Sequence, residues 1–122
     1  MKYLPLVSAG IWLPACRTCH WHEGQMRAIG GQSDRAFVLF QQARARVKPG
    51  YWEPYADATI AFMKRDKQAL LESRNTLAAL PRPENFNSKD AHGNPVSITW
   101  PPFLDVADRL VRCFDRSYLE AY

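Results

Sequence analysis

The stretch CRTCHWH at positions 16–22 carries two thiols and two imidazoles within seven residues. Its first five residues read C-x-x-C-H, the spacing at which haem of the c type is attached. On that interpretation Cys16 and Cys19 would form thioethers, and His20 would be the proximal ligand. Met63 would supply the other axial ligand. Haem attachment requires export of the chain, and a c-type haem protein is therefore one alternative hypothesis for its function.

A C-x-x-C pair at the start of a helix can also lower a thiol pKa and cycle through a disulfide. The all-helical alkylhydroperoxidase D proteins use such a pair, which makes thiol oxidoreductase chemistry a second alternative. Those proteins place their histidine one residue farther from the second cysteine than His22 lies from Cys19. They also use an upstream glutamate, whereas no acidic residue precedes Cys16 in this sequence.

We expect no metal site and no catalytic residues. Four donors on one helical turn, at Cys16, Cys19, His20 and His22, cannot all converge on a tetrahedral zinc ion. The remaining donors, such as Cys113, are isolated in the sequence. No nucleophile-elbow or phosphate-loop spacing is present. The sequence therefore predicts a non-enzymatic protein that needs no cofactor.

Composition restricts the class of protein further. A chain of 122 residues that is 47% hydrophobic can bury one core and is too short for two comfortable domains. Its 16 basic and 12 acidic side chains are intermixed, so nucleic-acid binding is not expected. Three cysteines cannot complete a disulfide framework, which favours a reducing compartment and a cytoplasmic location.

The N-terminal segment MKYLPLVSAGIWLPAC gives the alternative of export. LPAC loosely resembles a bacterial lipoprotein processing box, with Cys16 as the modified residue. However, Pro5 and Pro14 interrupt the apolar run, and Lys2 is its only basic residue. The run is also too short to span a bilayer, so no membrane association is expected.

From position 16 onward the hydrophobic pattern is helical. Cys19, His22, Met26 and Ile29 recur at spacings of three and four, which predicts that they form the apolar face of a first helix ending at Gly30-Gly31. On this interpretation Cys19 and His22 are packing residues and not ligands.

Four further helices are predicted from the same periodicity. Ser33 or Asp34 can cap the second helix and Asp66 the fourth. Five prolines between positions 81 and 102 predict a long loop, in which only Val96 to Trp100 could be extended. We therefore expect a single all-α domain over residues 1–122, with a first hairpin at 16–47, a second hairpin at 52–80, the loop at 81–102 and a C-terminal helix at 103–116, followed by an aromatic tail.

The two hairpins can be superimposed at an offset of 33 residues, which aligns Ala36 with Ala69. The first hairpin resembles a tetratricopeptide repeat, because its small and large packing residues fall at that family's spacings: Gly24, Gly31, Ala36, Phe40 and Ala43, with Pro49 near the terminal proline. The second hairpin is degenerate, since Ser73 replaces the aromatic residue and Asp57 replaces the first glycine. The resemblance covers about residues 16–80.

The resemblance implies antiparallel helical hairpins in right-handed packing and a scaffold that binds proteins or peptides. The ligand would lie against the first helix of each hairpin, at Thr18, Trp21, Gln25, Ala28, Tyr51, Pro54 and Ala58. Because stable arrays need about three repeats, the fifth helix or a partner chain must cover an exposed end. A homodimer would be one such arrangement.

Overall fold

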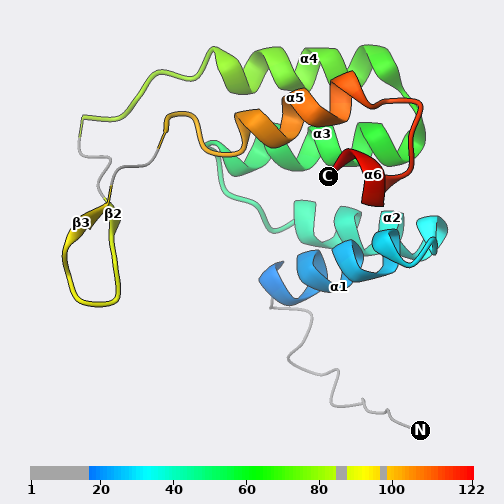
Figure 1. Ribbon diagram of the computed structural model, residues 1–122, viewed down its shortest axis with the longest axis horizontal. Coiled ribbons are helices and arrows are strands. Elements are labelled where there is room, and N and C mark those ends of the chain that lie inside the picture. Colours follow the sequence, from blue (N-terminus) through cyan, green and yellow to red (C-terminus); the bar gives the residue numbers. More distant parts are fainter. Residues whose placement is uncertain (1–16, 85–87, 97–98) are drawn as a thin grey trace, which may run out of the picture.

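The computed structural model describes residues 17–84, 88–96 and 99–122. The expected all-α class is confirmed, because helices dominate these ranges and the only strands in them form one short pair (Figure 1). The elements in chain order are α1 (Arg17–Ile29), α2 (Ser33–Arg44), α3 (Trp52–Lys64), α4 (Lys67–Ala78), β2 (Ser88–Lys89), β3 (Pro95–Val96), α5 (Leu104–Arg112) and α6 (Tyr118–Ala121).

Helix α1 buries a different face from the one that its sequence pattern suggested. Trp21 is 2% exposed and Ala28 is buried, so this side of the helix faces the core. Cys19 and His22 are exposed, and Met26 is 64% exposed. The prediction that Cys19, His22 and Met26 belong to the apolar face of this helix is therefore wrong. An indole offers far more apolar surface to bury than a thiol or an imidazole, and this decides which way the helix turns.

The contact between α1 and α2 depends on small residues. A Cβ atom at Gly24 would lie 2.8 Å from two carbons of the Phe40 ring, which is closer than real Cβ contacts. Phe40 and Ala36 are fully buried. The ring of Trp21 lies beside Phe40, with 4.6 Å between their centroids. The aromatic ring thus fills the space that the missing side chain of Gly24 leaves.

Ala36→Leu is expected to lower the free energy of unfolding by about 1–3 kcal/mol, because the larger side chain overpacks a closed interface between helices. Ala36 has no exposed surface, so the added carbons must displace neighbouring side chains. Urea denaturation followed by circular dichroism measures the change. The control is Ala78→Leu, at an exposed position at the end of α4. Equal stability of the two variants would contradict the close approach of α1 and α2.

Two of the predicted helix ends are confirmed. Helix α1 ends at Ile29, and Gly31 follows in the left-handed conformation with φ of +82°, which glycine adopts without strain. Asp66 caps α4, and its side chain accepts a hydrogen bond of 3.1 Å from a backbone N–H of the first turn. The prediction that Ser33 or Asp34 caps α2 is wrong. The N-cap residue of this helix is Gln32, and its side chain makes no capping hydrogen bond.

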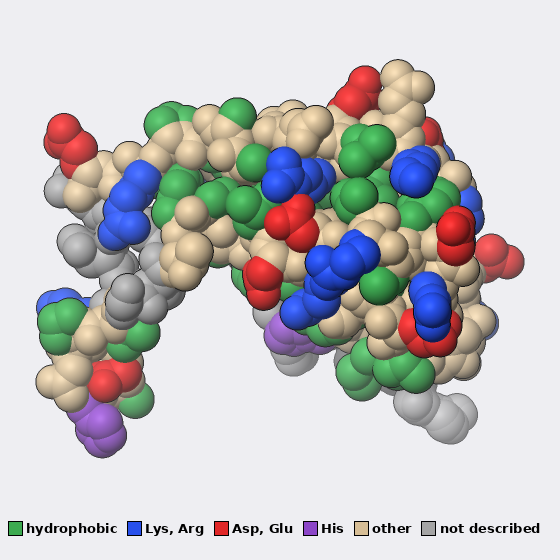
Figure 2. All heavy atoms as spheres, turned by 45° about the horizontal axis from the view of Figure 1, so that its top comes forward, with side chains coloured by type: hydrophobic (Ala, Val, Ile, Leu, Met, Phe, Trp, Pro, Cys, Tyr) green, Lys and Arg blue, Asp and Glu red, His purple; other side chains and the backbone are tan. Residues whose placement is uncertain are grey.

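Ion pairs join successive helices across their contacts. Arg44 of α2 donates to Asp57 at 2.7 Å and to Glu53 at 3.1 Å, and both carboxylates belong to α3. Their proximity raises the pKa of Arg44, chiefly through the hydrogen bond to Asp57. Arg74 of α4 donates to Asp108 of α5 at 2.6 Å. Figure 2 shows basic and acidic side chains interspersed over one face of the molecule.

Helix α5 packs against both α3 and α4 (Figure 1). Its buried side chains are Val106, Ala107 and Leu110, which join the same core as the two hairpins. Helix α5 therefore covers part of the second hairpin. The core is therefore built from the hairpin of α1 and α2, the hairpin of α3 and α4, and α5 as a third layer, and α6 adds Tyr118 and Ala121 to it.

The predicted loop at 81–102 is an arm that contains a hairpin. Strands β2 and β3 pair in antiparallel fashion, and Asp90 stabilises the turn by accepting hydrogen bonds from the backbone N–H groups of His92 and Asn94. Trp100 closes the base of the arm, since its indole N–H donates to the carbonyl oxygen of Leu80 at 2.8 Å. Both views show the hairpin standing apart from the helices (Figures 1 and 2).

None of the helices in the described ranges is both long and apolar enough to cross a membrane. The longest of them, α1 and α3, have 13 residues each. The predicted alternative of an export signal concerns residues 1–16, which lie outside the described residues.

Candidate functional site

The residues expected to form an aromatic tail fold into a short helix, α6. Ser117 and Glu120 form a capping box at its start, in which each side chain hydrogen-bonds the other residue's backbone. Tyr118 is 3% exposed and Ala121 is buried, whereas Leu119 is 60% exposed. Helix α6 therefore buries one tyrosine and one alanine against the rest of the molecule, and Tyr122, directly after it, interacts with Tyr55.

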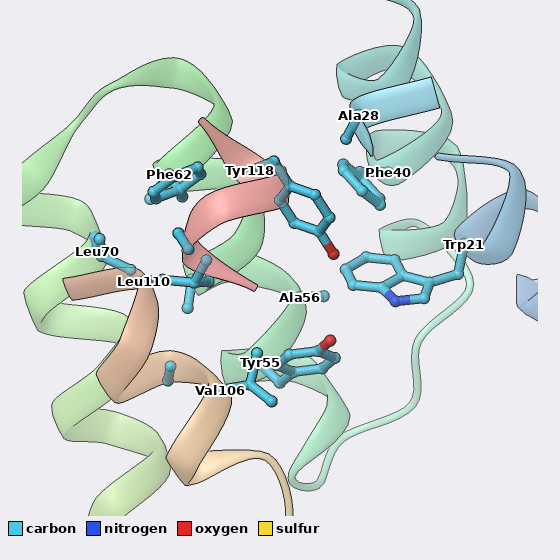
Figure 3. Packing of buried hydrophobic residues seen from close by; sticks show 14 of the residues in the cluster. Trp21, Ala28, Phe40, Tyr55, Ala56, Phe62, Leu70, Val106, Leu110 and Tyr118 are labelled. Carbon is cyan, nitrogen blue, oxygen red and sulfur yellow. The ribbon is translucent and has the colours of Figure 1, made fainter. Parts of the chain in front are cut away.

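The side chain of Tyr118 inserts between the two helical hairpins, α1 with α2 and α3 with α4. Its ring centroid lies 6.1 Å from that of Phe40 on α2 and 6.3 Å from that of Phe62 on α3. Its hydroxyl accepts a hydrogen bond of 3.4 Å from Nε2 of Gln25 on α1. Figure 3 shows the ring beside Phe40, with the hydroxyl directed toward Trp21. We call the surrounding residues the tyrosine cradle: Trp21, Gln25, Phe40, Tyr55 and Phe62.

Aromatic contacts fix the floor of the cradle. Trp21 lies 5.5 Å from Tyr55 and 5.2 Å from Trp52 between ring centroids, which ties α1 to α3. Tyr55 in turn stacks on Phe103 at 4.4 Å, with an interplanar angle of 18°. Rings in such tilted and stacked contacts are more strongly held than their buried area alone would indicate. The cradle is thus an aromatic site, and Phe103, directly before α5, supports its floor.

The hydroxyl groups in the cradle are held in the neutral form. Burial raises the pKa of Tyr118 above its ordinary value of 10.0, and the nearby Tyr55 adds to this effect. The hydrogen bond from Gln25 acts in the opposite direction, because it stabilises the phenolate. Burial also raises the pKa of Tyr55, and the electrostatic interaction with Tyr122 raises it further.

These shifts predict a loss of stability in alkali. A tyrosine whose pKa is raised in the folded state stabilises the fold fully below its unfolded pKa of about 10, and this contribution is lost as the pH rises above that value. We expect the melting temperature to fall above about pH 10, and to fall less steeply in Tyr118→Phe. Thermal melts by circular dichroism across this range measure the slope. Identical slopes for both proteins would contradict the buried, neutral phenol.

Arg65 holds the segment that leads into α6. Its Nη1 donates to the carbonyl oxygens of Phe114 at 2.6 Å and Arg116 at 2.9 Å, and its guanidinium lies 4.7 Å from the centroid of the Phe62 ring. Arg65 follows α3 in the left-handed conformation, with φ of 60°. This single exposed side chain therefore clamps the linker between α5 and α6.

The structure brings together only some of the predicted groove residues. Trp21, Gln25 and Ala28 share the buried side of α1, and the first two belong to the tyrosine cradle. Trp21 and Ala28 are core residues and not an open surface, because α6 and α3 cover this side. Nothing is described of the side chain of Thr18.

The predicted groove residues near α3 lie elsewhere. Tyr51 contacts Trp100 and Phe103 at the base of the arm. Pro54 is buried beside a small crevice between α3 and α4, and Ala58 is fully buried in the core. These three residues do not form one ligand surface with α1.

Three residues of this site were not predicted from the sequence: Arg65, Phe62 and Tyr118. For Tyr118 a signal was available: Ser117-x-x-Glu120 is a capping box, with aromatic residues at 118 and 122. Arg65 carries no comparable local signal, because its partners lie about fifty positions away in the sequence.

The structure describes CRTCHWH only from Arg17 onward. Cys16 lies outside the described residues, and Cys19 is disulfide-bonded, so it offers no thiol to haem in this state. His20 is half-buried, and its Nδ1 has no hydrogen-bond partner among the described residues. Met63 of α3, the second axial ligand in the haem hypothesis, packs against the core.

Cys113 is a free thiol. Within the described ranges no group of three or more His, Cys, Asp or Glu side chains is arranged to hold a metal ion.

No family model matches this chain, and neither the curated proteins nor the solved structures yield a match. The candidate functional site of this chain is the tyrosine cradle, formed by side chains of α1, α2 and α3.

Proposed function

We propose that this chain is a non-catalytic helical scaffold that binds a protein or peptide, as its resemblance to tetratricopeptide repeats implies. The observation that carries this proposal is the tyrosine cradle. Side chains from α1, α2 and α3 enclose one tyrosine of a separate short helix and hydrogen-bond its hydroxyl through Gln25. Insertion of an aromatic anchor from one helix between others is a common mode of peptide recognition.

The packing of the first hairpin supports the same proposal. The approach of Gly24 to Phe40 and the burial of Ala36 agree with the roles that the repeat spacing assigns to these residues. Tryptophan, tyrosine and arginine also contribute most strongly to binding in protein interfaces. Two of these residue types, at Trp21 and Tyr55, form the floor of the cradle.

The test is selection of peptides from a random phage-displayed library on the immobilised full-length chain. We expect enriched sequences with an aromatic anchor. On isotope-labelled protein, selected peptides should shift the NMR signals of the Trp21 indole N–H and the Gln25 side-chain amide. Gln25→Ala should weaken binding, whereas Gln41→Ala, at an exposed position on α2, should not. Absence of enrichment, or shifts confined to other surfaces, would count against the scaffold.

The disulfide at Cys19 supports a second candidate, a thiol oxidoreductase. In this case, the pair in CRTCHWH would exchange with protein or small-molecule disulfides. Thiol titration in glutathione buffers gives its redox potential, and reduction of insulin gives an exchange activity. The activity should disappear in Cys19→Ser and persist in Cys113→Ser, which removes the free thiol. Equal activity in the wild type and Cys19→Ser would exclude this candidate.

A further inference from the structure

Helix α6 buries only two of its own residues, Tyr118 and Ala121. It is one turn long, and a helix of this length has no stability of its own in water. Its order therefore depends on docking, in which Tyr118 and Ala121 are buried while Leu119 and Glu120 remain exposed. Outside the helix, the polar clamp from Arg65 fixes the linker.

We infer that α6 is a displaceable occupant of the tyrosine cradle, and that the cradle's external ligand is a helical segment carrying tyrosine and alanine at the spacing Tyr-x-x-Ala. This inference rests on the proposed function and specifies the ligand and its regulation. The chain's own helix shows what the cradle accepts.

The contacts of α6 define the chemistry of that ligand. The cradle accepts a phenol ring between Phe40 and Phe62 and places an amide donor at its hydroxyl. A phenylalanine in this place would leave the Gln25 amide without its partner, which favours tyrosine. Three residues later, Ala121 is 1% exposed, and a larger side chain there would meet packed atoms. The two intervening positions, Leu119 and Glu120, face solvent.

Competition between α6 and an external ligand follows from the tether. A segment on the same chain has a high effective concentration at its site, so it blocks an identical segment supplied in trans. The apparent dissociation constant of the external ligand equals its intrinsic value divided by the fraction of molecules whose cradle is open. Any change that weakens the docking of α6 without altering the cradle should therefore strengthen external binding.

The experiment uses the full chain and a synthetic peptide with the sequence DRSYLEAY, residues 115–122, labelled with fluorescein at its N-terminus. Fluorescence anisotropy measures binding to the wild type and to two variants. Tyr118→Ala removes the internal anchor. Arg65→Asn removes the clamp while keeping a residue that tolerates the left-handed conformation. The control is Leu119→Ala, which changes an exposed side chain of α6.

Both variants are expected to bind the peptide about tenfold or more tightly than the wild type does, and the control is expected to bind like the wild type. A peptide whose tyrosine at position 118 is replaced by alanine should not bind. Binding should shift the Gln25 side-chain amide signal of Tyr118→Ala toward its position in the wild type. If Tyr118→Ala does not fold, as judged by circular dichroism, Arg65→Asn decides the comparison.

Equal affinity for the wild type and Arg65→Asn, or no binding to either variant, would overturn the inference. Binding without a shift of the Gln25 side-chain amide would overturn it as well, because the peptide would then lie elsewhere. These outcomes are distinct from a failure of the proposed function. Library-selected peptides that bind at the cradle while DRSYLEAY does not would leave the scaffold standing and remove only the role of α6.

Discussion

Phe40→Ala is expected to lower the free energy of unfolding by about 3–5 kcal/mol, the largest effect of any substitution considered for this chain. The Phe40 ring is fully buried and contacts three parts of the structure: the backbone beside Gly24, the indole of Trp21 and the ring of Tyr118. Its loss leaves a cavity that the rigid aromatic floor cannot close. Urea denaturation followed by tryptophan fluorescence and circular dichroism measures the change.

Val38→Ala on the same helix is the control, because Val38 is 51% exposed and should cost little. The contact with Gly24 can be tested in the same series. Gly24→Ala should destabilise the wild type, but should do so less in the background of Phe40→Ala, where the ring that clashes is absent. Additive effects of the two substitutions would contradict the direct contact. A small effect of Phe40→Ala alone would contradict the packing of the whole first hairpin.

Leu110→Ala is expected to lower the free energy of unfolding by about 2–5 kcal/mol. Leu110 is a fully buried residue of α5, the helix that packs against both α3 and α4. Its truncation should therefore weaken the third layer of the core and, through it, the second hairpin. Hydrogen exchange followed by NMR should show faster exchange in α3 and α4 as well as in α5.

Arg112→Ala is the matched control on α5, because its side chain is exposed. It should leave both stability and exchange rates close to those of the wild type. If Leu110→Ala accelerates exchange only in α5, the helix is an appendage and the two hairpins are stable without it. This result would remove the role of α5 as the cover of the second hairpin.

Helix positions were predictable because their signals are local. Gly31 and Asp66 act on the backbone within a few residues, and their roles at helix ends followed from residue type alone. The buried face of α1 was not predictable in the same way. Two sets of residues on this helix recur at spacings of three and four: Cys19, His22, Met26 and Ile29, and also Trp21, Gly24, Gln25 and Ala28. Only contact with α2 and α3 decides between them.

The tyrosine cradle was beyond prediction for a related reason. Gln25 and Tyr118 are separated by 93 positions, and no periodicity joins residues so far apart. The resemblance to tetratricopeptide repeats implied that Trp21, Gln25 and Ala28 share one face of the first helix. It could not indicate that a helix from the other end of the sequence lies on this face. The resemblance to tetratricopeptide repeats likewise stays a prediction.

The closed base of the arm has a consequence for how freely this part of the chain can vary in length. The hydrogen bond from Trp100 to Leu80 brings the ends of the arm together independently of the hairpin beyond them. The entropy of closing a flexible connection grows only slowly, by about 0.6 kcal/mol for each doubling of its length. The exposed turn at Ala91, His92 and Gly93 can therefore accept an inserted epitope, fluorophore site or small domain while the helical core keeps its stability.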